Sequence, residues 1–312
     1  MIGVVNKKGV FFTLLAFVII AIFVLSFSFI SKIEERQSVE KRVESLNDFV
    51  LGLEEDIPRQ LYTSGFRMIF LLENKIFEKG TYVPDLDASL QEAFFNGTIY
   101  GEEASLMSGA TFSGIENSLR IKAAKVNANL SLENPVLAVY QESSWNIRVN
   151  LTADFFVEDV SGLASWNRTG TFSVLIPVSN FDDPLYIVNT DGLVTHKIVQ
   201  TPYTTFVVGE DVSNLLGHLN GHYSIESASG PSFLDRLQGL TSGSGNGIES
   251  LVHLQELSGQ GIIVEDKSVV DYIYFSSSNP SACNVVPAGM PSWFKLDSGH
   301  LFNYQVNCQE GG

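Results

Sequence analysis

VFFTLLAFVIIAIFVLSFSFI occupies residues 10–30 and contains no charged residue, no glycine and no proline. A helix of this length, rising about 1.5 Å per residue, spans about 31 Å, which matches the roughly 30 Å of a bilayer's hydrocarbon core. A cleaved secretory signal has a shorter apolar region, of about 7–15 residues, followed by small residues. The segment therefore predicts a transmembrane helix over residues 10–31, with a cleaved signal as the alternative.

Positive residues flank this segment on both sides. Two precede it and four follow it closely, at positions 7, 8, 32, 36, 41 and 42. Counting positive charges alone favours a cytoplasmic location for the long C-terminal part. The leading segment is short, however, and long domains translocate largely regardless of charge. We therefore expect residues 1–9 to be a short cytoplasmic leader of a single-pass protein in the cell membrane, with the rest extracytoplasmic.

Residues 7–24, KKGVFFTLLAFVIIAIFV, resemble the N-terminus of type IV pilin-like proteins. In that family a peptidase cuts after the glycine that ends a basic leader, and the apolar helix is both membrane anchor and assembly core. The resemblance implies processing between Gly9 and Val10, and contacts with other pilin-like subunits or membrane proteins through this helix. Leu14 departs from the pattern, since major pilins usually carry glutamate at this fifth mature position. A minor pilin-like subunit fits better.

A second helix pattern follows the apolar segment. Apolar residues recur at spacings of three and four, and Gly80 follows them as a stop signal. The stripe comprises residues 39, 43, 46, 50, 53, 57, 61, 68, 72 and 76. Pro58 lacks a backbone donor and predicts a kink or short break. The pattern predicts a juxtamembrane amphipathic helix over residues 32–80, covered by the rest of the chain, with a coiled-coil dimer as the alternative.

Residues 81–195 read as an α+β domain. Apolar and polar residues alternate along 145–157 and again along 172–178, which indicates two strands with one buried face each. Residues 136–140 are expected to pair on the other side of the first strand, so the three form an antiparallel meander. Helices are expected at 84–96 and 105–129.

The remaining residues, 196–312, predict a small β-rich region, with a soft boundary near residue 195. A short strand is expected at 185–188, before this boundary, and further short strands at 262–264, 269–275 and 293–296. Cys283 and Cys308, the two cysteines of the chain, would form one disulfide in an oxidising compartment. Closing this loop would contribute roughly 3 kcal/mol on the chain-entropy model.

The charge balance limits the classes of partner. The net charge is −16, and the first 31 residues carry only Lys7 and Lys8, so the remainder carries −18. An acidic surface of this size repels nucleic acid. His218 and His222 have the spacing of two metal ligands on one helix face, but neighbouring glycines weaken the helix and no third ligand lies near. We therefore expect no nucleic acid, metal or cofactor.

Four Asn-x-Ser/Thr sequons make glycosylation candidates of Asn96, Asn129, Asn150 and Asn167. Asn150 falls on the polar face of its strand and Asn167 in the following hairpin loop. Sequons together with a pilin-like N-terminus favour an archaeal surface protein. The nucleophile elbow, the phosphate-binding loop and the dinucleotide fingerprint are missing from the sequence, so we predict no enzyme. The expected function is structural, with a signal-anchored binding or receptor module as the alternative.

Overall fold

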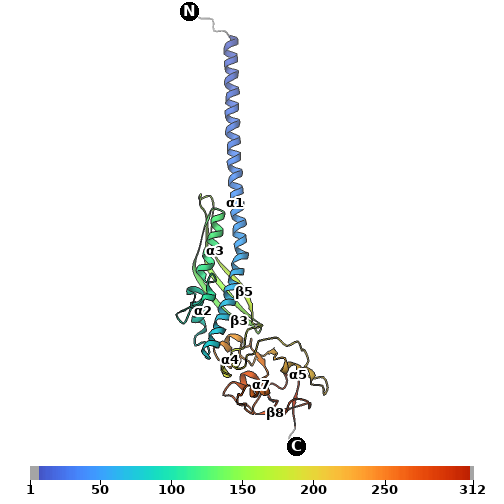
Figure 1. Ribbon diagram of the computed structural model, residues 1–312. Coiled ribbons are helices and arrows are strands. Elements are labelled where there is room, and N and C mark those ends of the chain that lie inside the picture. The colour runs from blue at the N-terminus through green and yellow to red at the C-terminus, as the bar shows by residue number, and fades with distance from the viewer. Residues whose placement is uncertain (1–6, 310–312) are drawn as a thin grey trace, which may run out of the picture.

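The computed structural model describes residues 7–309, and its longest element is one continuous helix, α1, from Lys7 to Lys79. α1 joins the apolar segment to the amphipathic segment, and Figure 1 shows it as a rod whose lower part is packed by the rest of the chain. The expected break at Pro58 is wrong, because the helix runs through it. Ile57 and Leu61 on either side are fully buried, so packing holds the helix where one backbone hydrogen bond is lost.

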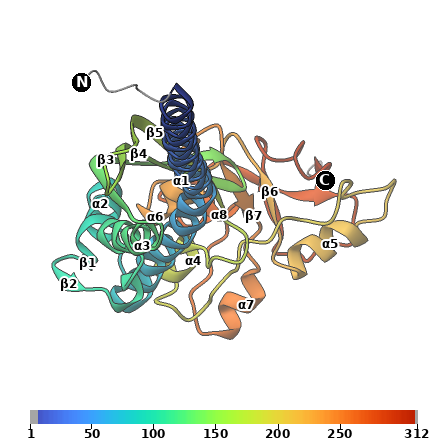
Figure 2. The same cartoon turned by 90° about the horizontal axis from the view of Figure 1, so that it is seen from above.

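The apolar stripe of α1 faces the protein's own core from Leu46 to Ile76, whereas Val39 and Val43 at its start stay exposed. Leu46, Leu53, Ile57, Leu61 and Leu72 are at most 2 % exposed. The helix lies against the inner face of a sheet and against the helices beside it, as the view along its axis shows (Figure 2). The amphipathic face is therefore covered within one chain, and no second helix is needed to bury it.

The sheet is a three-stranded antiparallel meander in the order β3-β4-β5, as the sequence predicts. Every second residue of the central strand is buried, and Ile147 pairs with Ile176 on the inner face. β3 extends well beyond the expected 136–140. The bounds are β3 Ala128–Ser143, β4 Asn146–Asp159 and β5 Ser165–Pro177.

The first predicted helix is present, but the second is shorter than expected. α2 spans Leu86–Asn96, and the Asp85 side chain caps it by accepting from the Ala88 N–H. Over 105–129 the chain instead forms a 3₁₀ turn, a left-handed Gly109, helix α3 and the start of β3. The other elements here are β1 Thr98–Ile99, β2 Glu102–Glu103, η1 Ser105–Met107 and α3 Phe112–Lys125.

The C-terminal region consists mostly of irregular segments and short helices, so the expected β-rich character is wrong. Residues 185–188 are helical, because Asp183 caps the turn and Pro184 fits its first position. No strand forms at 262–264, and 269–275 forms a helical turn after one bridge. The helices are α4 Pro184–Asn189, α5 Ser213–Asn220, α6 Phe233–Leu237, α7 Leu254–Gly259 and α8 Asp271–Tyr274.

Two small antiparallel sheets complete this region. β6 Ser224–Glu226 pairs with β7 Ile248–Ser250. The other sheet has the order β10-β8-β9, and β9 partly overlaps the expected strand at 293–296. Its strands are β8 Ala282–Val286, β9 Lys295–Asp297 and β10 Asn307–Cys308.

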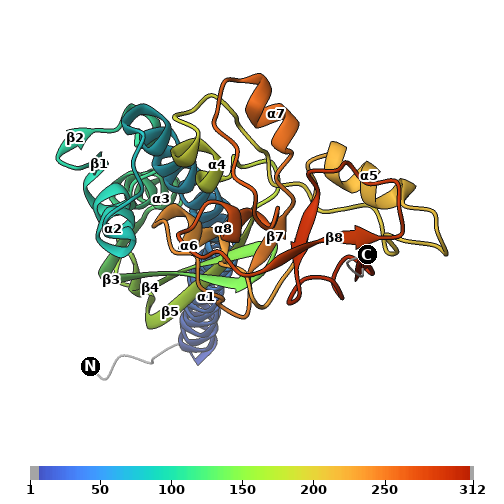
Figure 3. The same cartoon turned by 90° about the horizontal axis from the view of Figure 1, so that it is seen from below.

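Two hydrophobic cores lie along the molecule. The first is formed by α1, α2, α3 and the meander, and the second by the C-terminal region, visible from below in Figure 3. The division is not a clean cut at residue 195, because Phe233, Leu237 and Ile248 belong to the first core. The chain thus crosses between the cores, and the domain boundary stays a prediction.

Candidate membrane anchor and assembly site

The N-terminal part of α1 carries apolar side chains that the rest of the protein does not cover. Residues Phe11–Ile30 form a stretch long and apolar enough to cross a membrane, and none of it is buried inside the protein. Phe17 is 78 % exposed and Leu15, the least exposed of the large side chains here, is 44 % exposed. Such a surface is stable in lipid or against other apolar helices, but not in water.

The expected processing site lies at the free end of this helix. Gly9 is exposed, and the space where a Cβ would stand contacts nothing within 4 Å. The Thr13 hydroxyl donates to the Gly9 carbonyl at 3.1 Å, which satisfies that hydroxyl inside an apolar segment. Leu14 is 63 % exposed. Residues 1–6 of the expected leader lie outside the described residues.

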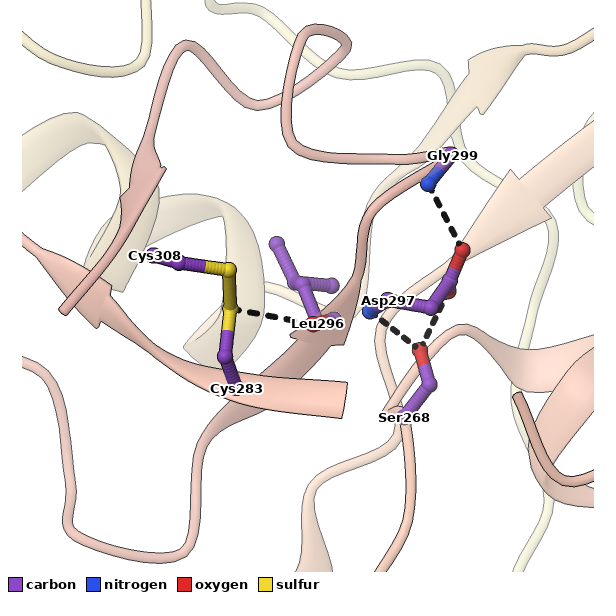
Figure 4. Close-up of a disulfide and its surroundings, with 6 residues drawn as sticks. All are labelled: Ser268, Cys283, Leu296, Asp297, Gly299 and Cys308. Carbon is purple, nitrogen blue, oxygen red and sulfur yellow. Dashed lines mark hydrogen bonds between the residues drawn. A yellow bond between two sulfur atoms is a disulfide. The ribbon is translucent and has the colours of Figure 1, made fainter. Parts of the chain in front are cut away.

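The predicted disulfide is present between Cys283 in β8 and Cys308 in β10 (Figure 4), with Cα atoms 5.5 Å apart. Beside it, the Ser268 hydroxyl donates to Asp297 at 2.7 Å, and the Gly299 N–H donates to the same carboxylate at 3.0 Å. The bridge ties β10 to β8, and β8 pairs in turn with β9, the strand that carries Asp297.

Three of the four sequon asparagines are open to solvent. Asn96, Asn129 and Asn167 are exposed, at the end of α2 and on strands β3 and β5, so the expected place of Asn167 in the hairpin loop is wrong. Asn150 is half-buried in the central strand, and its side-chain oxygen has no hydrogen-bond partner among the described residues. A glycan fits the first three positions more readily than the fourth. Occupancy stays a prediction.

A fully buried ion cluster joins the two cores, and the sequence analysis missed it. Arg236 in α6 contacts Asp183, and its Nη1 lies 2.8 Å from Asp271. The Ser250 hydroxyl donates to Asp271 at 2.8 Å. Burial alone would lower the pKa of Arg236, but the charges of Asp183 and Asp271 raise it above its ordinary value. The guanidinium is therefore permanently charged and fixes α4, α6 and α8 together.

A second buried cluster lies in the C-terminal region. His300 Nδ1 lies 2.8 Å from Asp297, and its Nε2 lies 2.7 Å from the Tyr272 hydroxyl and 3.4 Å from Glu249. Burial would lower the pKa of His300, but the Asp297 hydrogen bond and the nearby carboxylates raise it. All four side chains are buried. A substrate has no access to them, so we interpret the cluster as structural.

The two histidines with metal-ligand spacing lie in different surroundings, His218 in α5 and His222 in the turn after it. His218 is fully buried and bonds Thr201 at 3.0 Å, whereas His222 points to Glu256 at 3.3 Å. The two side chains therefore do not converge. Within residues 7–309, no group of three or more histidine, cysteine or acidic side chains is arranged to hold a metal ion.

Comparison with known proteins finds no relative: no family model, no curated protein and no solved structure matches the chain. The features that remain are the bare apolar helix, the packed continuation of that helix, the disulfide and the exposed sequons. Of these, the helix is the feature that points to a function.

Proposed function

We propose that the chain is a membrane-anchored extracytoplasmic structural subunit, similar to a minor type IV pilin, that acts in filament assembly or surface adhesion. The observation that carries this proposal is the division of α1. Its first part is exposed on all sides over Phe11–Ile30, and its second part is packed into a folded domain without a break. Because the helix is continuous, the position of the folded domain is fixed relative to the lipid or the apolar helices that surround Phe11–Ile30.

Two further observations support an extracytoplasmic domain. The Cys283–Cys308 bridge requires an oxidising environment in most organisms. Three sequons are exposed on one half of the domain, where glycans would not disturb the core. An archaeal source and occupied sequons belong to the same proposal.

The N-terminus of the protein isolated from its native membrane tests the pilin-like part. Processing predicts a mature chain that begins at Val10, read by mass spectrometry. Gly9→Val should retain the leader and stay out of any assembly, whereas Gly52→Val, at an exposed glycine of the same helix, should be processed normally. An unprocessed wild-type chain, or normal assembly of Gly9→Val, would contradict this part and leave an ordinary signal anchor.

A signal-anchored binding module is the second candidate, and one observation favours it. An open cleft of about 330 Å³ lies beside β8, within the usual size range of ligand sites. Met290 and Phe294 contribute its apolar lining. Met290→Glu would abolish adhesion and leave assembly intact if the cleft binds a ligand. Unchanged adhesion would count against this candidate.

A further inference from the structure

The loop of the β4–β5 hairpin, residues 160–163, carries apolar side chains that the fold does not cover. Val160 is 64 % exposed and Leu163 is 46 % exposed. The loop lies beside α1 at the end of the folded part nearest to the apolar half of that helix (Figure 1). A groove of about 600 Å³ separates loop and helix, and Val39, Lys41 and Arg42 line its helix side.

The hairpin loop is fixed relative to α1. Arg42 donates to Asp159 at 2.8 Å and to the Asn127 carbonyl at 3.0 Å. The second oxygen of Asp159 accepts the Ser161 N–H at 2.9 Å, so one carboxylate holds both the helix and the loop. Val160 and Leu163 therefore keep their outward position and do not fold back into the core.

The distance to the apolar segment is short. The groove begins at Ser38, eight residues beyond Ile30, or about 12 Å along a helix. Each headgroup layer of a bilayer occupies roughly 5–7 Å beyond the hydrocarbon core. Transmembrane helices tilt by about 20° on average, and a segment on the side toward which the helix tilts moves closer to the bilayer. A tilt toward the hairpin brings its loop to the headgroups.

We propose that the β4–β5 hairpin loop and the adjoining face of α1 rest on the surface of the bilayer that holds the helix. This inference depends on the anchor in the proposed function and adds to it. The folded part then contacts the membrane surface, and residues 32–42 do not hold it away from the bilayer. Val160, Leu163 and Val39 supply apolar contact with the interface.

The charged residues around the groove fit this occupant. Lys32, Arg36 and Lys41 are exposed on the segment that leaves the apolar stretch, where Glu40 and Glu44 are exposed as well. Long basic side chains beside a transmembrane segment reach for lipid phosphates while their stems cover apolar surface. The bilayer is favoured over another protein because the groove begins only about 12 Å along α1 from the end of the apolar stretch.

A tryptophan at the loop tests the contact in the full chain. Val160→Trp and Val208→Trp form a matched pair, because their valines are 64 % and 63 % exposed, Val160 in a turn and Val208 directly before one. Val208 belongs to the segment leading into α5, at the other end of the folded part (Figure 1). Each variant is placed in nanodiscs with and without lipids brominated near the headgroup. The wild type gives the background of the three native tryptophans.

The expected result is strong quenching of the added emission in Val160→Trp and none in Val208→Trp. Equal, unquenched emission from both variants, with the chain inserted in the disc, would overturn the inference and leave the anchor intact. A shift of the Val160→Trp emission to shorter wavelength without lipid quenching would also overturn it, because another protein would then cover the loop. A chain that does not enter the disc would contradict the proposed function itself.

Discussion

The sheet-bearing half of the molecule and its C-terminal region are stabilised in different ways. Around α1, long regular elements bury one face each, and leucine, isoleucine and valine fill the core. In the C-terminal region the strands have two to five residues and the helices four to eight. There Arg236 and its carboxylates, the His300 cluster and the disulfide supplement a smaller apolar core. A periodic sequence produces the first kind of core. The second depends on single polar residues that come from distant segments of the chain.

This difference has an energetic consequence. Packing in a periodic core is shared among many similar contacts, so single changes are partly absorbed. A buried ion cluster depends on each member, because removal of one leaves an unpaired charge in a low dielectric. The C-terminal region should therefore respond more strongly to changes at single polar positions.

Arg236→Met is expected to have the largest effect. The substitution leaves Asp183 and Asp271 buried without their cation, which should cost about 3–5 kcal/mol of unfolding free energy. Chemical unfolding of the full chain in detergent, followed by circular dichroism, measures it. Triple replacement of Arg236, Asp183 and Asp271 by apolar residues should recover much of the loss. A single variant as stable as the wild type would mean that the cluster contributes little.

Removal of the disulfide should come next. Cys283→Ser together with Cys308→Ser opens a loop with a sequence separation of 25, and the expected loss is roughly 3 kcal/mol on the chain-entropy model. Hydrogen exchange followed by mass spectrometry should show faster exchange in β8, β9 and β10, with the meander unchanged. Equal loss of protection in both regions would show that the two regions unfold as one unit.

Glu73 in α1 allows the stability of the sheet-bearing half to be tested as a function of pH. Burial, with the charge of Asp182, raises the pKa of Glu73 to about 7, while the Asp182 N–H donates to its carboxylate. The folded state therefore keeps a proton that the unfolded state loses, so stability should fall as pH rises from about 4.5 to 7. Glu73→Gln should remove this dependence and stabilise the protein at pH 8 by on the order of 2–3 kcal/mol. Parallel pH–stability curves for the two proteins would contradict the assignment.

Gly65 should give the smallest effect and tests close packing. A Cβ at this position would lie 3.1 Å from Val149 and 3.3 Å from Ile176. Gly65→Val should therefore overpack the contact between α1 and the sheet and lower the free energy of unfolding by about 1–3 kcal/mol. Gly52→Val on the same helix meets no atom within 4 Å and should be neutral or slightly stabilising. Equal effects at the two glycines would mean that the helix shifts to accommodate the methyl groups.

The same contrast explains what could be predicted from the sequence. The apolar segment, the stripe of α1 and the alternation along β4 have periods of 3.6 and two, and these indicate secondary structure and its buried face directly. The break expected at Pro58 does not form, because the burial of Ile57 and Leu61 holds the helix together although proline lacks a backbone donor. The strands expected at 185–188 and 269–275 are wrong, because a short apolar run does not distinguish a strand from a buried helical turn.

The candidate site follows the same logic. The disulfide could be predicted because Cys283 and Cys308 are the two cysteines of the chain, whereas the processing site at Gly9 and Val10 stays a prediction from a local motif. The Arg236 cluster could not, because Arg236 lies 53 residues from Asp183 and 35 from Asp271 and no spacing rule connects them. Asp183 before Pro184 gave a local hint of a helix cap, but not of the cation it binds.

The central claim is that α1 crosses the membrane once and holds the folded part outside. Protease added to intact cells, followed by mass spectrometry of the membrane fraction, tests it most directly. We expect the folded part to be digested from outside, while a fragment containing residues 10–30 stays in the membrane and resists alkaline washing. A folded part that is digested only after the membrane is opened, or a chain released by the wash, would contradict it.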